Sequence, residues 1–403
     1  MTNTWVLSAL WVGLALLATL FAIWFRVSTA LSEIVVGTVA QLIIGAAFGR
    51  GGLLGNTEWI SFLAGTGAIV LTFLAGAELD PTIFRSKWRE ALIIGLAGFF
   101  GPFFGCTLIV HFLLHWSIMA SWLCGVALST TSVAVVYAVM LELGFNATEY
   151  GKAILAACFI NDLGTVIALG LIFSPFTVKT VIFVVVSVVI FAILPFLTPW
   201  FFRKYGGRVS ELEAKYLLFL LFGLGGLALW AGSEAVLPAY LIGMVLAGTV
   251  GKDHALIRRL RTLTFGFLTP FYFIRAGSFV SVPALLAGPV VLLVLFFAKM
   301  LTKLVAVLPA VRGHQYEGSS GMYYTLMMST GLTFGTISAL FGLNHKVITE
   351  AQYSYVAGTV IGSAVIPTLI ANMFFLPRHL LPKKHEAATP KRTLQEPAES
   401  EGI

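Results

Sequence analysis

The apolar residues of this chain come in blocks of about twenty, and these blocks constrain its fold more than any other feature. Helices of that length cross the hydrocarbon core of a bilayer, whereas the strands of a membrane barrel alternate polar and apolar residues. Hydrophobic residues make up 58% of the 403 residues and charged residues 11%, against about 25% charged residues in soluble domains. We therefore predict an all-α integral membrane protein. This class excludes a cytosolic enzyme, a secreted disulfide-rich domain and a nucleic-acid-binding domain.

The apolar blocks predict thirteen transmembrane helices. Their approximate limits are 5–25, 33–49, 59–79, 91–115, 119–143, 149–172, 178–201, 215–233, 236–250, 263–280, 284–309, 320–342 and 350–376. The first block has neither a basic leading segment nor a small-residue cleavage site, so we interpret it as a retained helix and not as a signal peptide. The membrane domain is thus predicted over residues 1–376. The polar residues 377–403 are expected to form a short disordered tail.

The distribution of Lys and Arg residues predicts the orientation of these helices. If the N-terminus lies outside, 19 of the 25 Lys and Arg residues fall in cytoplasmic connections or in the tail, and three fall in outer connections. The remaining three, Arg275, Lys299 and Lys303, lie within spans. We therefore predict a multi-pass protein of the cell membrane with an outer N-terminus and a cytoplasmic C-terminus.

Two spans are interrupted by small polar residues about two hundred positions apart. The fifth span contains Ser129-Thr130-Thr131-Ser132, and the twelfth contains Ser329-Thr330-Gly331. The glycines of the second and ninth spans, such as Gly37 and Gly243, form a similar pair. Members of each pair are seven spans apart and therefore run in opposite directions. This pattern predicts an inverted-topology repeat with two broken helices that cross near the middle of the membrane.

Asp162 is a carboxylate in the middle of a span, the sixth. An ionisable residue at this depth is costly, so it marks a functional site unless it serves only in a buried ion pair that holds helices together. Burial favours the protonated acid and a nearby cation favours the carboxylate, so such a group can bind a proton or a metal cation. The adjacent Asn161 either contributes an oxygen ligand or forms a hydrogen bond between helices.

Three basic residues lie within predicted spans. We expect Lys299 either to pair with Asp162 or to serve a purely structural role. Lys303 lies one turn nearer the cytoplasmic end, and its long side chain is expected to extend to the inner surface. Arg275 either lines a polar cavity or extends outward, and its permanent charge prevents it from exchanging protons.

Other polar side chains are interpreted as structural. Four acidic residues at the cytoplasmic ends of spans are expected to be solvated caps: Glu33, Glu78, Asp80 and Glu142. Three cysteines lie singly in apolar blocks and are expected to be small buried side chains without a disulfide or metal ion: Cys106, Cys124 and Cys158.

Five motifs, taken in order, resemble the sodium/proton exchanger domain of the monovalent cation/proton antiporter superfamily. They are similar to the branch that contains bacterial sodium/proton and potassium/proton antiporters. The resemblance covers roughly residues 30–376. The motifs are Leu-Ala-Gly-Ala-Glu-Leu-Asp-Pro at 74–81, Ala-Leu-Ser-Thr-Thr-Ser-Val-Ala at 127–134, Asn161-Asp162, Pro-Phe-Tyr-Phe at 270–273, and Lys299.

The resemblance implies a homodimer in the bacterial inner membrane with elevator-like alternating access. Spans 4–6 and 11–13 would form the ion-translocating core, and spans 1–3 and 8–10 the dimer scaffold. Asp162 would bind the ion and Lys299 would pair with it. Thr131 and Ser132 would supply oxygens from an unwound segment, with Ser129 and Thr130 as accessory residues.

The chain departs from the family pattern in two places, at the Asn161 and Lys299 pair and at Arg275. Asn161 is typical of the electroneutral branch, whereas that branch usually carries arginine where this chain has Lys299. Arg275 replaces the small residue that is frequent among close relatives.

We expect antiport of Na+ or K+ against H+, electroneutral and without a cofactor, with the protein itself and membrane lipids as partners. A passive or gated cation channel on the same fold is the alternative. Motifs of intramembrane enzymes, such as a zinc-binding HExxH pair or a GxSxG elbow, are absent from the sequence.

Overall fold

A computed structural model describes residues 4–25, 29–48, 53, 55, 57–77, 81–145, 148–173, 177–207, 210–233 and 235–381. Within these residues every regular element is a helix, and nine helical stretches are long and apolar enough to cross a membrane. The predicted acidic caps Glu78 and Asp80, the side chain of Glu142 and the tail from residue 382 lie outside the described part of the chain.

The helices follow one another with short connections. The first half contains α1 (Thr4–Phe25), α2 (Thr29–Phe48), α3 (Glu58–Ala77), α4 (Pro81–Leu113), α5 (Ile118–Ser129), α6 (Val133–Glu142), α7 (Glu149–Phe173) and α8 (Val178–Tyr205). The second half contains α9 (Leu212–Trp230), α10 (Val236–Leu246), α11 (His254–Leu263), the π-helical turn η2 (Thr264–Leu268), α12 (Thr269–Ser278), α13 (Val282–Ala287), α14 (Pro289–Gly313), α15 (Gly318–Met328), α16 (Thr333–Asn344), α17 (Glu350–Phe374) and the 3₁₀ turn η3 (Arg378–Leu380). Each of the thirteen predicted spans corresponds to one or two of these helices.

The two predicted helix breaks are confirmed. The fifth span divides into α5 and α6 because Thr130 adopts an extended conformation, with φ −62° and ψ 151°. The twelfth span divides into α15 and α16, and Leu332 before α16 has φ −146° and ψ −69°. The two breaks lie against each other, since α5 packs on α16 and Thr131 bonds to the last residue of α15.

The beginning of the tenth span differs from the prediction. We expected a helix from residue 263, but α11 begins at His254 and continues through η2 into α12. One face of α11 buries Leu256, Ile257 and Leu260, and the other exposes Arg258 and Arg259. These charges lower the average hydropathy of the segment, so a search for apolar blocks does not detect it.

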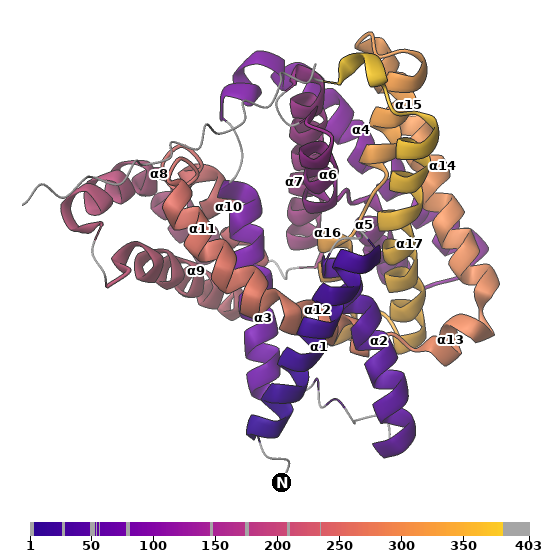
Figure 1. Cartoon of the computed structure of the whole chain (residues 1–403), viewed down its shortest axis with the longest axis horizontal. Helices are drawn as coiled ribbons and strands as arrows, with labels where there is room; N and C mark the ends of the chain where they lie inside the picture. Colours follow the sequence, from indigo (N-terminus) through magenta and orange to yellow (C-terminus); the bar gives the residue numbers. More distant parts are fainter. Residues whose placement is uncertain are drawn as a thin grey trace, which may run out of the picture.

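The helices pack as two groups (Figure 1). The α3 group contains α1–α3, α8–α12 and η2, and the α4 group contains α4–α7 and α13–α17. Among the described helices, α7 and α10 make the principal helix-to-helix contact between the groups. At this contact the Tyr240 ring stacks on Phe159, with ring centroids 5.1 Å apart, and meets Phe334 edge-on at 5.5 Å.

Glycine pairs allow two close crossings in the α3 group. At the crossing of α2 and α12, a Cβ on Gly37 would meet the Ile274 carbonyl, and one on Gly277 would meet the Ile34 carbonyl. At the crossing of α3 and α10, Gly76 and Gly243 play the same part. The inverted repeat relates α2 to α10 and α12 to α3, so each crossing is the counterpart of the other.

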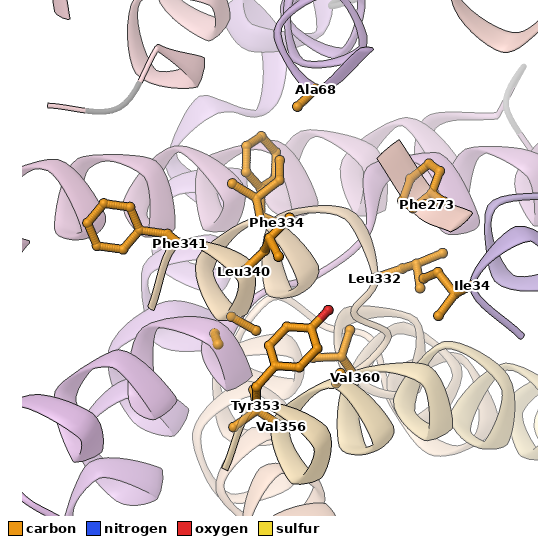
Figure 2. Close-up of a cluster of buried hydrophobic side chains, with 14 of the residues drawn as sticks. Ile34, Ala68, Phe273, Leu332, Phe334, Leu340, Phe341, Tyr353, Val356 and Val360 are labelled. Carbon is orange, nitrogen blue, oxygen red and sulfur yellow. The ribbon is translucent and has the colours of Figure 1, made fainter. Parts of the chain in front are cut away.

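An apolar cluster separates the second helix break from the α3 group. Figure 2 shows Leu332 directed at Ile34 of α2 and Phe273 of α12, while Phe334 is directed toward Ala68 of α3. All five side chains are buried. The two groups meet here mainly through apolar surface, and the Tyr353 hydroxyl of α17 donates a hydrogen bond of 2.6 Å across it to the Ala276 carbonyl of α12.

Candidate functional site

Asp162 lies near the middle of α7 and is 2% exposed. The helix packs closely on α4, where a Cβ on Gly95 would meet Ile160 and a Cβ on Gly98 would meet the Asn161 amide. The Asn161 Nδ2 group donates a hydrogen bond of 3.4 Å to the Gly95 carbonyl. These contacts fix the position of Asn161-Asp162 at the centre of the α4 group.

The break between α5 and α6 faces Asp162. The backbone N–H groups of Thr131 and Val133 point toward the carboxylate. Val133 is the first residue of α6, and Thr131 lies two residues before it. At this end of the helix, the unpaired N–H groups and the helix dipole favour negative charge. The local unwinding of the fifth span therefore brings its backbone donors to the carboxylate of the neighbouring helix.

The hydroxyl groups of the break differ in their roles. Thr131 Oγ1 donates to the Met328 carbonyl at 2.8 Å and so joins the two broken helices. Ser132 Oγ accepts a hydrogen bond of 3.4 Å from the Val135 N–H. Ser129 and Thr130 donate to carbonyls of their own helix, at 2.9 Å and 3.0 Å. The structure thus brings Thr131 close to Asp162. The Ser132 hydroxyl bonds within the start of α6, and the hydroxyls of Ser129 and Thr130 bond within the end of α5.

Two oxygen atoms are left without partners in the site. Among the described residues, neither Asp162 Oδ1 nor Asn161 Oδ1 has a hydrogen-bond partner, although both atoms are buried. A buried acceptor without a protein partner can be satisfied by an ordered water molecule or by a bound ion. Oxygen atoms of this kind suit a proton or a small hard cation.

The two lysines of α14 are both fully buried. Lys299 Nζ donates to Ser363 Oγ at 2.9 Å, and Lys303 Nζ donates to Thr131 Oγ1 at 3.1 Å. Among the described residues neither lysine forms an ion pair with Asp162, but both interact with it electrostatically, Lys303 more strongly than Lys299. The expectation that Lys303 extends to the inner surface is therefore wrong. Its hydrogen bond to the helix break offsets part of the cost of burial.

Arg275 lies at the C-terminal end of α12, in the α3 group. Its Nε donates to the Gly55 carbonyl at 2.8 Å, and its guanidinium lies 4.9 Å from the centre of the Phe279 ring. It therefore fastens the connection between α2 and α3 and does not extend outward.

Two further expectations can be compared with the structure. Glu33 is 2% exposed and thus not a solvated cap, because the start of α2 is covered by neighbouring helices. The three cysteines are buried, as expected. Cys158 lies one turn before Asp162, with Sγ 3.5 Å from Met328 Sδ.

Two residues of the site were missed by the interpretation of the sequence. The burial of Lys303 could have been inferred, since residues four apart share a face of a helix and Lys299 was expected to face inward. Nothing in the sequence marked Ser363 of α17 as a partner of Lys299, because a single serine in an apolar span is common in membrane helices.

Comparison with known proteins assigns the chain to a family. The family described as "Sodium/hydrogen exchanger, transmembrane" matches residues 12–376. A probable Na+/H+ antiporter of Methanocaldococcus jannaschii is 25% identical over 376 residues, covering 88% of this chain and 95% of that protein. The Na+/H+ antiporter of Enterococcus hirae is 23% identical, over 83% of this chain and 91% of its own length.

Another relative has a name that refers to potassium instead of sodium. The glutathione-regulated potassium-efflux system protein KefC of Shigella sonnei is 24% identical over 74% of this chain, which spans half of that protein. Among solved structures, a sodium proton antiporter from Methanocaldococcus jannaschii superposes with a TM-score of 0.67 at 14% sequence identity, covering 93% of this chain and 98% of its own. That likeness shows a shared fold, and the family match over residues 12–376 shows that the chain belongs to the sodium/hydrogen exchanger family.

Proposed function

We propose that the protein exchanges a monovalent cation, Na+ or K+, for H+ across a cell membrane. The observation that carries this proposal is the buried carboxylate of Asp162, whose Oδ1 lacks a partner among the described residues at the crossing of two broken helices. The family match and the names of the relatives, which include Na+/H+ antiporters and a potassium-efflux protein, support it.

Asp162 binds either a proton or a cation in this proposal. Asn161 Oδ1 and the oxygens of Thr131 and Ser132 provide further ligands for the cation, and no cofactor takes part. Either ligand neutralises the carboxylate. Carrying a bare carboxylate through the low-dielectric centre of the membrane is costly, so only a loaded site crosses, and the two fluxes are coupled.

Alternating access in this proposal is a movement of the α4 group against the α3 group. The apolar cluster around Leu332 supports such a movement, because apolar surfaces can slide past each other. The movement would break the hydrogen bonds that Tyr240 and Tyr353 donate between the groups, to the Phe159 and Ala276 carbonyls. The α3 group would serve as the scaffold and as the interface of a homodimer. The N-terminus would face outward and the C-terminus the cytoplasm, in a bacterial inner membrane.

The test of the site is the substitution Asp162→Asn in proteoliposomes loaded with a pH-sensitive dye. We expect the variant to fold and to lose cation-driven proton movement for Na+, Li+ and K+, each tested separately. The matched control is Asp253→Asn, since Asp253 is a carboxylate that caps α11 and Asn is an equally good cap.

Residual exchange in Asp162→Asn above the level of protein-free liposomes would remove Asp162 from the site. A channel would give a different result in the wild type, since its cation flux would not be coupled to protons moving the other way.

A further inference from the structure

We propose that this structure is the conformation in which the site is closed on the side where α16 lies, and that Tyr353 is a positioning residue whose hydroxyl group holds it closed. This α16 side is the outer side in the proposed orientation. The inference rests on the proposed function, because it concerns the movement of the α4 group against the α3 group. It makes the closed conformation the more populated one.

The half-helix α16 is enclosed between its own group and the α3 group. Every residue from Thr333 to Gly342 is buried. Phe334 is directed toward Ala68 of α3 (Figure 2), and its ring meets that of Tyr240 of α10 edge-on at 5.5 Å. Side chains of the α3 group therefore cover α16 in this conformation.

The equivalent half-helix of the inverted repeat, α6, packs mainly within its own group. Val136 and Met140 lie in an apolar cluster whose described members all come from the α4 group and its connections. Tyr137 and Val139 are partly exposed. In the part of the chain that the structure describes, the α3 group thus covers the α16 side of the site more completely than the α6 side.

The Tyr353 hydroxyl adds a directed bond to this closure. It donates a hydrogen bond of 2.6 Å to the Ala276 carbonyl of α12, and both residues are buried. The next residue, Ser354, accepts a hydrogen bond of 2.8 Å at its Oγ from the Ser281 N–H, in the connection that follows α12. The start of α17 is therefore attached to the end of α12, across the boundary between the two groups.

The inverted repeat has a different residue at the position of Tyr353. The equivalent helices α7 and α17 are both 25 residues long, and aligning their first residues places Lys152 opposite Tyr353. Lys152 Nζ lies 3.6 Å from Glu149 Oε1 of its own helix, and the two side chains are 30% and 67% exposed. Burying this ammonium group between the groups would cost more than burying a hydroxyl. Closure on the α6 side therefore lacks an equal of the Tyr353 bond.

The residues just before the two half-helices differ in the same sense. Leu332 precedes α16 and is directed at Ile34 and Phe273 of the α3 group (Figure 2). Ser132 precedes α6, and its Oγ accepts a hydrogen bond of 3.4 Å from the Val135 N–H of that helix. Burial of a leucine side chain is favourable, so this apolar contact also stabilises closure on the α16 side.

The test measures how often the α16 side opens, with a cysteine at position 338 as the reporter. Ser338 lies one turn after Phe334, is buried, and its hydroxyl has no partner among the described residues. The three native cysteines are replaced by alanine, and Ser338→Cys is labelled with a membrane-impermeant maleimide on either side of membrane vesicles. We expect slow labelling, which Tyr353→Phe accelerates about fivefold, because the hydrogen bond is lost only from the closed conformation.

Tyr324→Phe is the matched control. Tyr324 is also a buried tyrosine whose hydroxyl donates to a backbone carbonyl, that of Ala153 at 2.9 Å, but both residues belong to the α4 group. Its substitution should lower Tm as Tyr353→Phe does and change the labelling rate by less than about twofold, since this bond is present in both conformations.

Transport provides a readout that a purely structural role would not change. A cation that binds one conformation has an apparent affinity reduced by the fraction of molecules in that conformation. Tyr353→Phe should therefore lower KM on the α16 side about fivefold and leave KM on the α6 side nearly unchanged. Both values are measured with right-side-out and everted vesicles.

Fast labelling of Ser338→Cys with Tyr353 in place would contradict closure on the α16 side. Equal labelling rates in Tyr353→Phe and Tyr324→Phe, or equal changes of KM on both sides, would overturn the role of Tyr353. If Tyr353→Phe folds poorly, Leu332→Ala tests the closure in its place, and an unchanged labelling rate in that variant would contradict it. Labelling requires no transport, so these results are separate from the exchange assay of Asp162→Asn that tests the proposed function.

Discussion

At the scale of single residues, the candidate site contains a hydroxyl group, that of Thr131, which the helix break releases from its own helix. In a continuous helix, Ser and Thr side chains commonly bond back to the preceding turn. Ser129 and Thr130 still do so, with Val126 and Ala127, whereas Thr131 bonds across to the other broken helix. The same residue types therefore have different roles at successive positions.

Replacing Thr131 by Val and Ser132 by Ala together is expected to raise KM for the cation by at least about tenfold, because two oxygen ligands are lost, each worth on the order of 1 kcal/mol. KM is measured in proteoliposomes and Tm in detergent. The control is Thr325→Val, which removes a buried hydroxyl bonded within α15 to Gly321. An unchanged KM together with a lower Tm would mean that Thr131 and Ser132 serve packing and not cation binding.

At the scale of elements, the close crossings of helices depend on glycines, of which Gly37 and Gly243 belonged to the repeated pattern in the sequence and Gly76 and Gly277 did not. A Cβ on Gly277 would collide with the Ile34 carbonyl, which belongs to the backbone and cannot rotate away. We therefore expect Gly277→Ala to separate α12 from α2 and to destabilise the protein by about 1 to 3 kcal/mol.

The destabilisation of Gly277→Ala is measured as a decrease in Tm in detergent. Gly65→Ala is the matched control, because Gly65 lies on α3 with no neighbouring atom within 4 Å of an added Cβ. Its helix should be slightly stabilised, since Ala is the better helix former. Equal Tm values for the two variants would contradict the close crossing of α2 and α12.

At the scale of the whole molecule, the proposed cycle moves no net charge. Asn161 is neutral, so Asp162 carries one proton in one direction and one monovalent cation in the other, and neither lysine exchanges a proton in this cycle. A membrane potential contributes about 2.3 kcal/mol per charge per 100 mV to an electrogenic cycle and nothing to this one. We therefore expect an imposed potassium–valinomycin potential to leave the rate of Na+/H+ exchange unchanged.

Current on a solid-supported membrane provides the complementary measurement. A transient that reverses with the cation gradient would contradict electroneutral exchange. Its disappearance in Lys299→Gln or Lys303→Gln, with transport retained, would identify the lysine that releases a second proton.

Part of this picture follows from the sequence alone. Apolar blocks long enough to span a bilayer predicted thirteen membrane helices, and the Lys and Arg residues of their connections predicted the orientation of those helices. Both predictions were possible because the rules for span length and for loop charge act on each segment separately. The breaks between α5 and α6 and between α15 and α16 were predicted from runs of small polar residues, which are also a feature of the local sequence. Asp162 stood out because a carboxylate at that depth has a high cost wherever the helix packs.

The tertiary structure decided which partners those residues meet. Lys299 and Lys303 share one face of α14, and the sequence does not distinguish their surroundings. The crossing of the two breaks places Ser363 and Gly331 beside Lys299, and Thr131 beside Lys303. Arg275 meets the Gly55 carbonyl across 220 positions of the chain. Such contacts depend on how helices pack within the bilayer, and hydropathy and charge along the chain carry no information about that arrangement.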